Sequence, residues 1–202
     1  TEQIASRILA IAALRDVLSA FEAEQLPSPA EMEASVRRDI EMLQGLQNDD
    51  GGFPIWTRGR KSEPFYSIHT THALVRAQQK DFAVPQDTLN RALEFLRNVE
   101  SSYPEWYSQE IRWAMSAYAL YVRDMAGDND SGKASRILNE AGLDRLSLEA
   151  VAWLWQVLGT DSAESEEIFR HFMNRAVETA SAANFTTSYG DQDYLMLHSD
   201  RR

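Results

Sequence analysis

Apolar residues recur every three or four positions along most of the chain, the spacing that places them on one face of an α-helix. The first stripe consists of Ile4, Ile8, Ile11, Leu14, Leu18 and Phe21. It predicts a helix that ends near Leu26-Pro27, where proline stops the pattern. We expect all six apolar side chains to face the core.

A second helix is predicted to begin at Ser28-Pro29-Ala30-Glu31. This segment combines an N-cap hydroxyl, a proline in the first turn and an acid three residues after the cap. The apolar stripe continues through Met32, Val36, Ile40, Leu43 and Leu46. We therefore expect the helix to run to about residue 46.

The same spacing predicts further helices along the rest of the chain. They cover roughly residues 66–79, 85–98, 108–125, 132–140, 148–158 and 163–182. Strand-like alternation is nearly absent, and the short links favour antiparallel neighbours. The predicted fold class is all-α, a series of about eight helices in antiparallel hairpins.

Composition limits the architecture and the partners. The 202 residues are 44% hydrophobic, which suits one well-buried core, so we expect a single domain over 1–202. The net charge of −11 works against binding of nucleic acid, whose phosphates need clustered lysine and arginine. No apolar run is long enough to span a bilayer, so we expect no membrane contact by this chain.

The absence of cysteine excludes a disulfide framework, a cysteine-based zinc site and a cysteine nucleophile in this chain. His69 and His72 lie three residues apart, but zinc needs three or four ligands, and His171 and His198 are far along the chain. We therefore expect no metal site and no cofactor, and His72 packed beside its neighbours.

A loop between the second and third predicted helices carries Gly51 and Gly52. Paired glycines permit a tight reversal, so we expect Phe53 and Trp56 to fold back onto the core. A related turn is expected at residues 184–190. The Gln, Gly-Gly-Phe and Trp pattern resembles that of α/α toroids, which include terpenoid cyclases, prenyltransferase β-subunits and thioester domains.

Three segments resemble the thioester domain of bacterial alpha-2-macroglobulins. They are residues 1–7, residues 51–56 and residues 194–202. In that family a Cys-x-Glu-Gln stretch opens a helix, and the cysteine sulfur is joined to the glutamine side-chain carbonyl. Thr1, Glu2 and Gln3 match the last three positions. The resemblance implies that Gln3 is the acyl partner of a cysteine directly before Thr1, and that this chain alone is chemically inactive.

The resemblance also implies the function of a parent protein, which is an endopeptidase inhibitor and not an enzyme. A protease cuts a bait region, the thioester becomes exposed, and a lysine amine of the protease attacks the glutamine carbon. Partners would be target proteases and other domains of the parent chain, in the periplasm or cell envelope. Because further hairpins complete the ring in this family, we expect an incomplete α/α toroid that self-associates through its open edge.

A thioester needs an apolar shelter that keeps water away. In the complement branch a histidine assists acyl transfer, but residues 102–111 contain none, which favours direct reaction with amines. Trp106, Tyr107, Tyr194 and Met196 are candidates for the shelter. The alternative is that these side chains serve ordinary core and loop packing.

Two other functions stay open at this point. One is an α/α-toroid enzyme that acts on an isoprenoid or a polysaccharide. It would need an Asp-rich motif or two acids across a cleft, but Asp49-Asp50 lies in the Gly-Gly turn and Asp191-Gln192-Asp193 lacks a third acid. The acids at residues 161–167 mark a solvated helix start. The other is a family member that lost its thioester and traps proteases sterically.

Overall fold

The computed structural model describes residues 1–20, 28–178 and 182–185. Eight α-helices, one short 3-10 helix and a two-stranded hairpin make up these residues, which confirms the all-α fold class. The chain divides into two compact units, residues 1–102 and 103–202, which are described separately below. A single functional domain over 1–202 and its arrangement as part of a toroid stay predictions.

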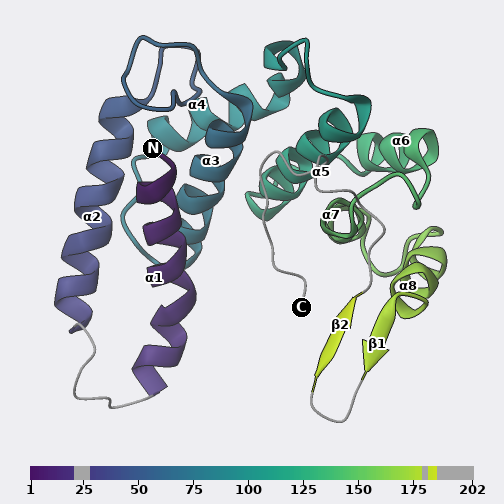
Figure 1. The fold of residues 1–202 in the computed structure, drawn as a ribbon. Helices are drawn as coiled ribbons and strands as arrows, with labels where there is room; N and C mark the ends of the chain where they lie inside the picture. The colour runs from purple at the N-terminus through teal and green to yellow at the C-terminus, as the bar shows by residue number, and fades with distance from the viewer. Residues whose placement is uncertain (21–27, 179–181, 186–202) are drawn as a thin grey trace. The chain divides into compact units, whose positions relative to one another are not determined.

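The described residues of the first unit form four α-helices, which are labelled in Figure 1. They are α1 (Glu2–Ala20), α2 (Pro29–Leu46), α3 (Pro64–Gln79) and α4 (Gln86–Arg97), followed by the 3-10 helix Val99–Ser102. Helix α1 packs against both α2 and α3, and α3 also packs against α4. Helix α1 therefore lies beside two other helices of this unit.

The buried side of α1 differs from the predicted stripe. Ala5, Ile8 and Ala12 are at most 1% exposed, whereas Leu14 is 48% exposed, so the prediction for Leu14 is wrong. Because α1 packs between α2 and α3, alanines on the facing side let the helix axes approach closely. The predicted positions Leu18 and Phe21 fall outside the residues whose side chains are described.

Helix α2 begins as predicted. The Ser28 hydroxyl accepts a hydrogen bond from the Glu31 backbone N–H, and the Glu31 carboxylate accepts one from the Ser28 N–H at 2.8 Å. This reciprocal pair confirms the capping box. Val36, Ile40 and Leu43 are buried, which confirms the central part of the predicted stripe.

The second unit is built on a close pair of helices, α5 (Gln109–Met125) and α7 (Leu148–Leu158). Helices α6 (Ser131–Ala141) and α8 (Ser165–Met173) pack against α7. The core between them includes Leu120, Leu146, Leu154 and Ile168, each at most 1% exposed. The acids that lead into α8 are exposed or half-buried, which confirms the predicted solvated helix start.

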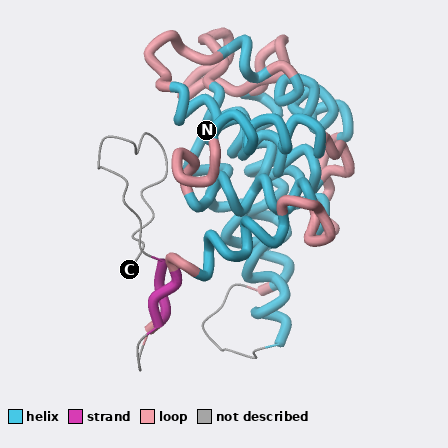
Figure 2. Tube along the Cα trace, turned by 90° about the vertical axis from the view of Figure 1, so that its right-hand side faces the viewer, coloured by secondary structure: helices cyan, strands magenta, loops and turns pink. Residues whose placement is uncertain are grey.

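The helix predicted over 163–182 is wrong beyond Met173. The chain continues as an antiparallel hairpin of β1 (Ala176–Glu178) and β2 (Ala183–Phe185), which Figure 2 shows beside the helices. The Phe185 ring lies 5.7 Å from that of Phe172, an apolar contact across the chain reversal. Of the turn expected at 184–190, residues 186–190 lie outside the described residues.

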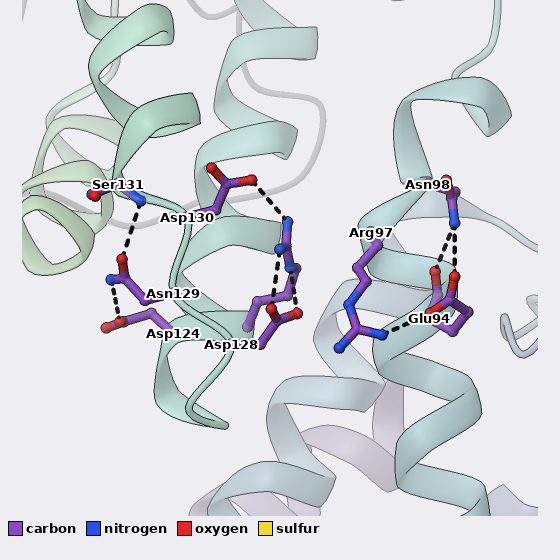
Figure 3. A network of polar contacts seen from close by, with 9 residues as sticks. Glu94, Arg97, Asn98, Asp124, Asp128, Asn129, Asp130 and Ser131 are labelled. Carbon is purple, nitrogen blue, oxygen red and sulfur yellow. Dashed lines mark hydrogen bonds and ion pairs between the residues drawn. The ribbon is translucent and has the colours of Figure 1, made fainter.

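The loop between α5 and α6 is organised around a buried cation (Figure 3). Arg123 is 8% exposed and pairs with Asp128 at 2.9 Å and with Asp130 at 3.7 Å. Asp130 also caps α6 by accepting a hydrogen bond from the Lys133 N–H at 3.0 Å. These acids therefore neutralise a buried guanidinium and start a helix.

No helix within the described ranges combines the length and the apolar character needed to cross a membrane.

Candidate functional site

Hydrogen bonds tie the start of α1 to the loop between α2 and α3, residues 47–63, which carries Gly51 and Gly52 and is called the Gly-Gly loop. The Thr1 hydroxyl donates a hydrogen bond to the Pro54 carbonyl at 2.6 Å, and the Thr1 amino group donates one to the Ile55 carbonyl at 3.3 Å. The Thr1 carbonyl accepts the first helical hydrogen bond, from the Ala5 N–H. The structure thus brings together two of the three segments that carry the family resemblance.

Glu2 and Gln3 follow on the exposed side of this turn. Among the described residues, Gln3 is exposed to solvent. If this acyl carbon were joined to sulfur, exposure would leave it open to attack by amines and by water alike. A water-sensitive bond at this position would need further cover, and the acyl role of Gln3 stays a prediction.

Two buried amides hold the Gly-Gly loop in shape. The Gln47 side chain is 2% exposed and donates hydrogen bonds to the carbonyls of Gly51 at 2.9 Å and Thr88 at 3.0 Å. The Asn48 side chain donates to the Arg60 carbonyl at 2.7 Å. Buried backbone carbonyls at this reversal are therefore satisfied by side chains. The expected tight turn is confirmed.

Both glycines are required by this packing. Gly51 has φ +86°, and a Cβ on it would lie 2.2 Å from the Arg91 carbonyl oxygen. A Cβ on Gly52 would lie 2.6 Å from the Ser62 Cβ. Any side chain at either position would push α4 or the loop out of place.

The two aromatic side chains of the loop differ in their exposure to solvent. Phe53 is fully buried, as predicted, and its N–H donates to the Ser67 hydroxyl at 2.8 Å. Trp56 is 81% exposed, so the prediction that it folds back onto the core is wrong. The turn that follows is held by a hydrogen bond from the Gly59 N–H to the Asn48 side-chain oxygen at 2.8 Å, not by burial of Trp56.

A polar cluster joins α1 to α3 next to Gln3. The Ser6 hydroxyl lies 3.0 Å from His69 Nε2 and 3.2 Å from the Glu2 carboxylate. The His69 ring stacks on Phe65 with centroids 5.5 Å apart. Burial lowers the pKa of His69, and the nearby Glu2 carboxylate partly opposes this effect. At neutral pH the ring is therefore uncharged.

Sequence reasoning considered His69 with His72 as a metal pair and missed its contact with Ser6. Burial lowers the pKa of His72 to about 4, with smaller contributions from His69 and Arg76. Across the described residues, no three His, Cys, Asp or Glu side chains gather as ligands for a metal ion. In the sequence, Ser6 can be seen to lie one turn after Gln3. Its contact with His69 can be found only when the packing of α3 against α1 is known.

The four predicted shelter residues are only partly described. Tyr107 is 5% exposed and Trp106 is 64% exposed, with their rings 4.7 Å apart in an edge-to-face contact. Both belong to the second unit, and Tyr107 packs there as an ordinary core residue would. Tyr194 and Met196 lie outside the described residues. The shelter role of all four stays a prediction.

Comparison with known proteins finds two that are similar in sequence to parts of the chain. No protein-family model matches the chain. An alpha-2-macroglobulin of Rickettsia conorii is 35% identical over 92 residues, which is 45% of this chain and 5% of the relative. An alpha-2-macroglobulin of Escherichia coli is 36% identical over 63 residues, which is 31% of this chain and 4% of the relative. The chain thus spans a small part of the length of both relatives.

Solved structures give the same result for the fold. The C-terminal part of native alpha-2-macroglobulin from Escherichia coli matches with a TM-score of 0.71 and 24% identity, over 84% of this chain and 28% of that chain. Salmonella alpha-2-macroglobulin reacted with methylamine matches with a TM-score of 0.68 and 21% identity, over 86% of this chain and 12% of that chain. The chain is therefore similar to a part of bacterial alpha-2-macroglobulins, as its motifs predict. The similarity in sequence covers up to 45% of the chain, and the similarity in fold covers most of it.

Proposed function

We propose that this chain is the scaffold of a thioester site in an alpha-2-macroglobulin-like protease inhibitor, with Gln3 as the acyl partner of a cysteine directly before Thr1. The carrying observation is the hydrogen bond from the Thr1 hydroxyl to the Pro54 carbonyl at 2.6 Å. It anchors the matched Thr1-Glu2-Gln3 motif to the Gly-Gly loop at the start of α1. The likeness to bacterial alpha-2-macroglobulins supports this assignment.

The proposed reaction is an acyl transfer in the parent protein. A target protease cuts a bait region elsewhere, the molecule rearranges, and the thioester meets a lysine amine of the protease. The amine nitrogen forms a bond to the Gln3 acyl carbon as the carbon–sulfur bond breaks. The amine proton ends on the released thiolate, and the protease is held through an amide. The chain has no cysteine of its own, so the reaction belongs to the parent protein.

The parent protein would act as an inhibitor and not as an enzyme, in the periplasm or cell envelope, with a lipid anchor as one way to hold it there. Its partners would be target proteases and the other domains of the same chain. The alpha-2-macroglobulin of Salmonella reacts with methylamine, a small primary amine. A primary amine is therefore the probe that suits the proposed site.

The test begins with the codon before Thr1. We expect cysteine there, and we expect the purified parent protein to incorporate methylamine at Gln3 with release of one thiol per chain. Peptide mass spectrometry locates the methylamide and a thiol reagent counts the sulfur. A residue other than cysteine would overturn the thioester and would leave steric trapping of proteases as the function to test. The same measurement on Gln3→Ala should show no methylamide, and its thiol should be free before any amine is added, because no thioester can form.

A further inference from the structure

The side chains around Gln3 on α1 carry polar groups that the proposed function leaves without a role. In an α-helix each Cα–Cβ bond tilts toward the N-terminus, and residues three or four apart are neighbours on the surface. The Ser6 side chain therefore leans back toward Gln3 and Glu2. Its contact with the Glu2 carboxylate at 3.2 Å agrees with this direction.

His69 meets the same hydroxyl from α3. Its Nε2 lies 3.0 Å from Ser6 Oγ, and the ring is held between this contact and the face of Phe65. Two proton arrangements fit the geometry. In one, Ser6 donates to Glu2 and His69 donates to Ser6. In the other, Ser6 turns its proton from Glu2 to His69 Nε2, and its oxygen can accept a proton from a ligand. The second arrangement gives Ser6 an accepting lone pair beside the first turn of α1.

Acyl transfer to an amine needs a proton acceptor at this place. A primary amine is mostly protonated at neutral pH and attacks only after losing a proton, and the attacking nitrogen loses a second proton as the amide forms. An uncharged imidazole within reach suits this task better than a charged one. Glu2 is exposed on the same turn, where its negative charge attracts cations.

We propose that Ser6 and His69 form a proton relay for the attacking amine, an inference that rests on the proposed function. Ser6 Oγ accepts the proton from the amine nitrogen while its own proton passes to His69 Nε2. As the carbon–sulfur bond breaks, the thiolate of the cysteine before Thr1 takes up the proton that His69 gives back through Ser6. His69 acts through Ser6 and is thus a positioning residue, with Glu2 as the attracting charge.

The test is the rate of methylamine incorporation by the full parent protein, followed by thiol release across a pH range. Ser6→Ala and His69→Gln should each slow the reaction by about tenfold or more, because both break the relay. Ser6→Thr keeps the hydroxyl and should restore most of the rate. His69→Gln should also make the pH dependence of the rate below neutrality less steep, since only the titration of the amine itself then remains.

The charged and titratable groups near His69 enter the interpretation of this profile. Glu2 of α1 raises the pKa of His69, and His72 lies one turn along α3. His72→Gln is therefore the matched control, a change of the same chemistry on the same helix. It should leave the rate and the pH profile as in the wild type.

The outcomes separate the two proposals. No incorporation by the wild-type parent would overturn the thioester function and this relay with it. Normal incorporation that neither Ser6→Ala nor His69→Gln slows would overturn the relay alone. An equal loss in His72→Gln would also overturn it, because the effect would then come from the packing of α3. Hydrogen exchange of the α3 amides shows whether each variant keeps its fold. If His69→Gln disturbs α3, the test of the relay rests on Ser6→Ala, which removes a single oxygen atom.

Discussion

Both carboxylate oxygens of Asp39 accept hydrogen bonds from the guanidinium of Arg7, which ties α1 to α2 one turn after Gln3. The Asp39 side chain is 3% exposed, whereas that of Arg7 is about half exposed. The hydrogen bond and the charge of Asp39 raise the pKa of Arg7. A carboxylate this deep needs a partner, because removal from water disfavours its charge.

Removing that partner should destabilise the first unit. Arg7→Ala leaves the Asp39 carboxylate buried and unpaired, and we expect the free energy of unfolding to fall by about 2 kcal/mol. Urea unfolding measures this change. Arg38→Ala, at an exposed position on α2, is the control and should change stability by less than about 0.5 kcal/mol. Equal losses in the two variants would contradict a special role for the pair.

The sequence predicts most of the fold because each helix carries its own signals. The Ser28 to Glu31 box and the stripe through Val36 and Leu43 act within a few residues, and the structure agrees with them. Leu14 departs from its prediction because α1 is apolar on more than one side. Which side is buried then depends on α2 and α3, and this information is not local.

The candidate site divides in the same way. The Gly51-Gly52 reversal is a local property and was predictable. The exposure of Trp56 was not, because the turn after it is held by a hydrogen bond from Gly59 to the more distant Asn48. The Ser6 and His69 contact joins positions 63 residues apart. No spacing rule within one helix reveals such a pair, so it emerges only once α1 and α3 are packed together.

Glycine replacements separate contact from backbone strain. Gly51→Ala combines a positive φ with a Cβ at 2.2 Å from the Arg91 carbonyl, so we expect a loss of about 3 kcal/mol or more. Gly59→Ala has a similar φ of +85° and no atom within 4 Å, and should lose about 1 kcal/mol. Gly45→Ala, inside α2 with open space, should gain about 0.5 kcal/mol. Chemical denaturation ranks the three, and any other order contradicts the argument.

His72 predicts how stability depends on pH. Its pKa is about 4 in the folded chain against 6.5 as the ordinary value, so the unfolded chain binds the proton more tightly. Stability is therefore present above the unfolded pKa and is lost as the pH falls. Between pH 7 and pH 5 this group alone should lower the free energy of unfolding by about 2 kcal/mol.

The variant His72→Gln tests that assignment. Its own stability should fall less steeply between pH 7 and pH 5 than that of the wild type, by about the same 2 kcal/mol. Differences between the two proteins cancel the carboxylates, which titrate in both. Parallel curves would show that His72 is not the group responsible.

Self-association is expected from the apolar side chains on the outer surface of the second unit. Phe169 and Met173 on α8 are 54% and 55% exposed, and Val177 and Phe185 on the hairpin are 40% and 45% exposed. Light scattering over a concentration series should show a rising mass for the 202-residue chain. The double variant Phe169→Ser with Met173→Ser should reduce it, whereas a wild-type chain that stays monomeric would contradict the expectation.

Thr1 offers the most direct link between the fold and the proposed chemistry. Thr1→Val removes the hydroxyl that donates to the Pro54 carbonyl, while it keeps the shape of the side chain. We expect a loss of about 1 kcal/mol in stability and a looser first turn of α1. In the parent protein the thioester should then hydrolyse faster, because Gln3 moves with that turn. The rate of thiol release without added amine measures this hydrolysis. Thr1→Ser keeps the hydroxyl and should behave as the wild type. An unchanged rate in Thr1→Val would show that the contact with the loop does not protect the thioester.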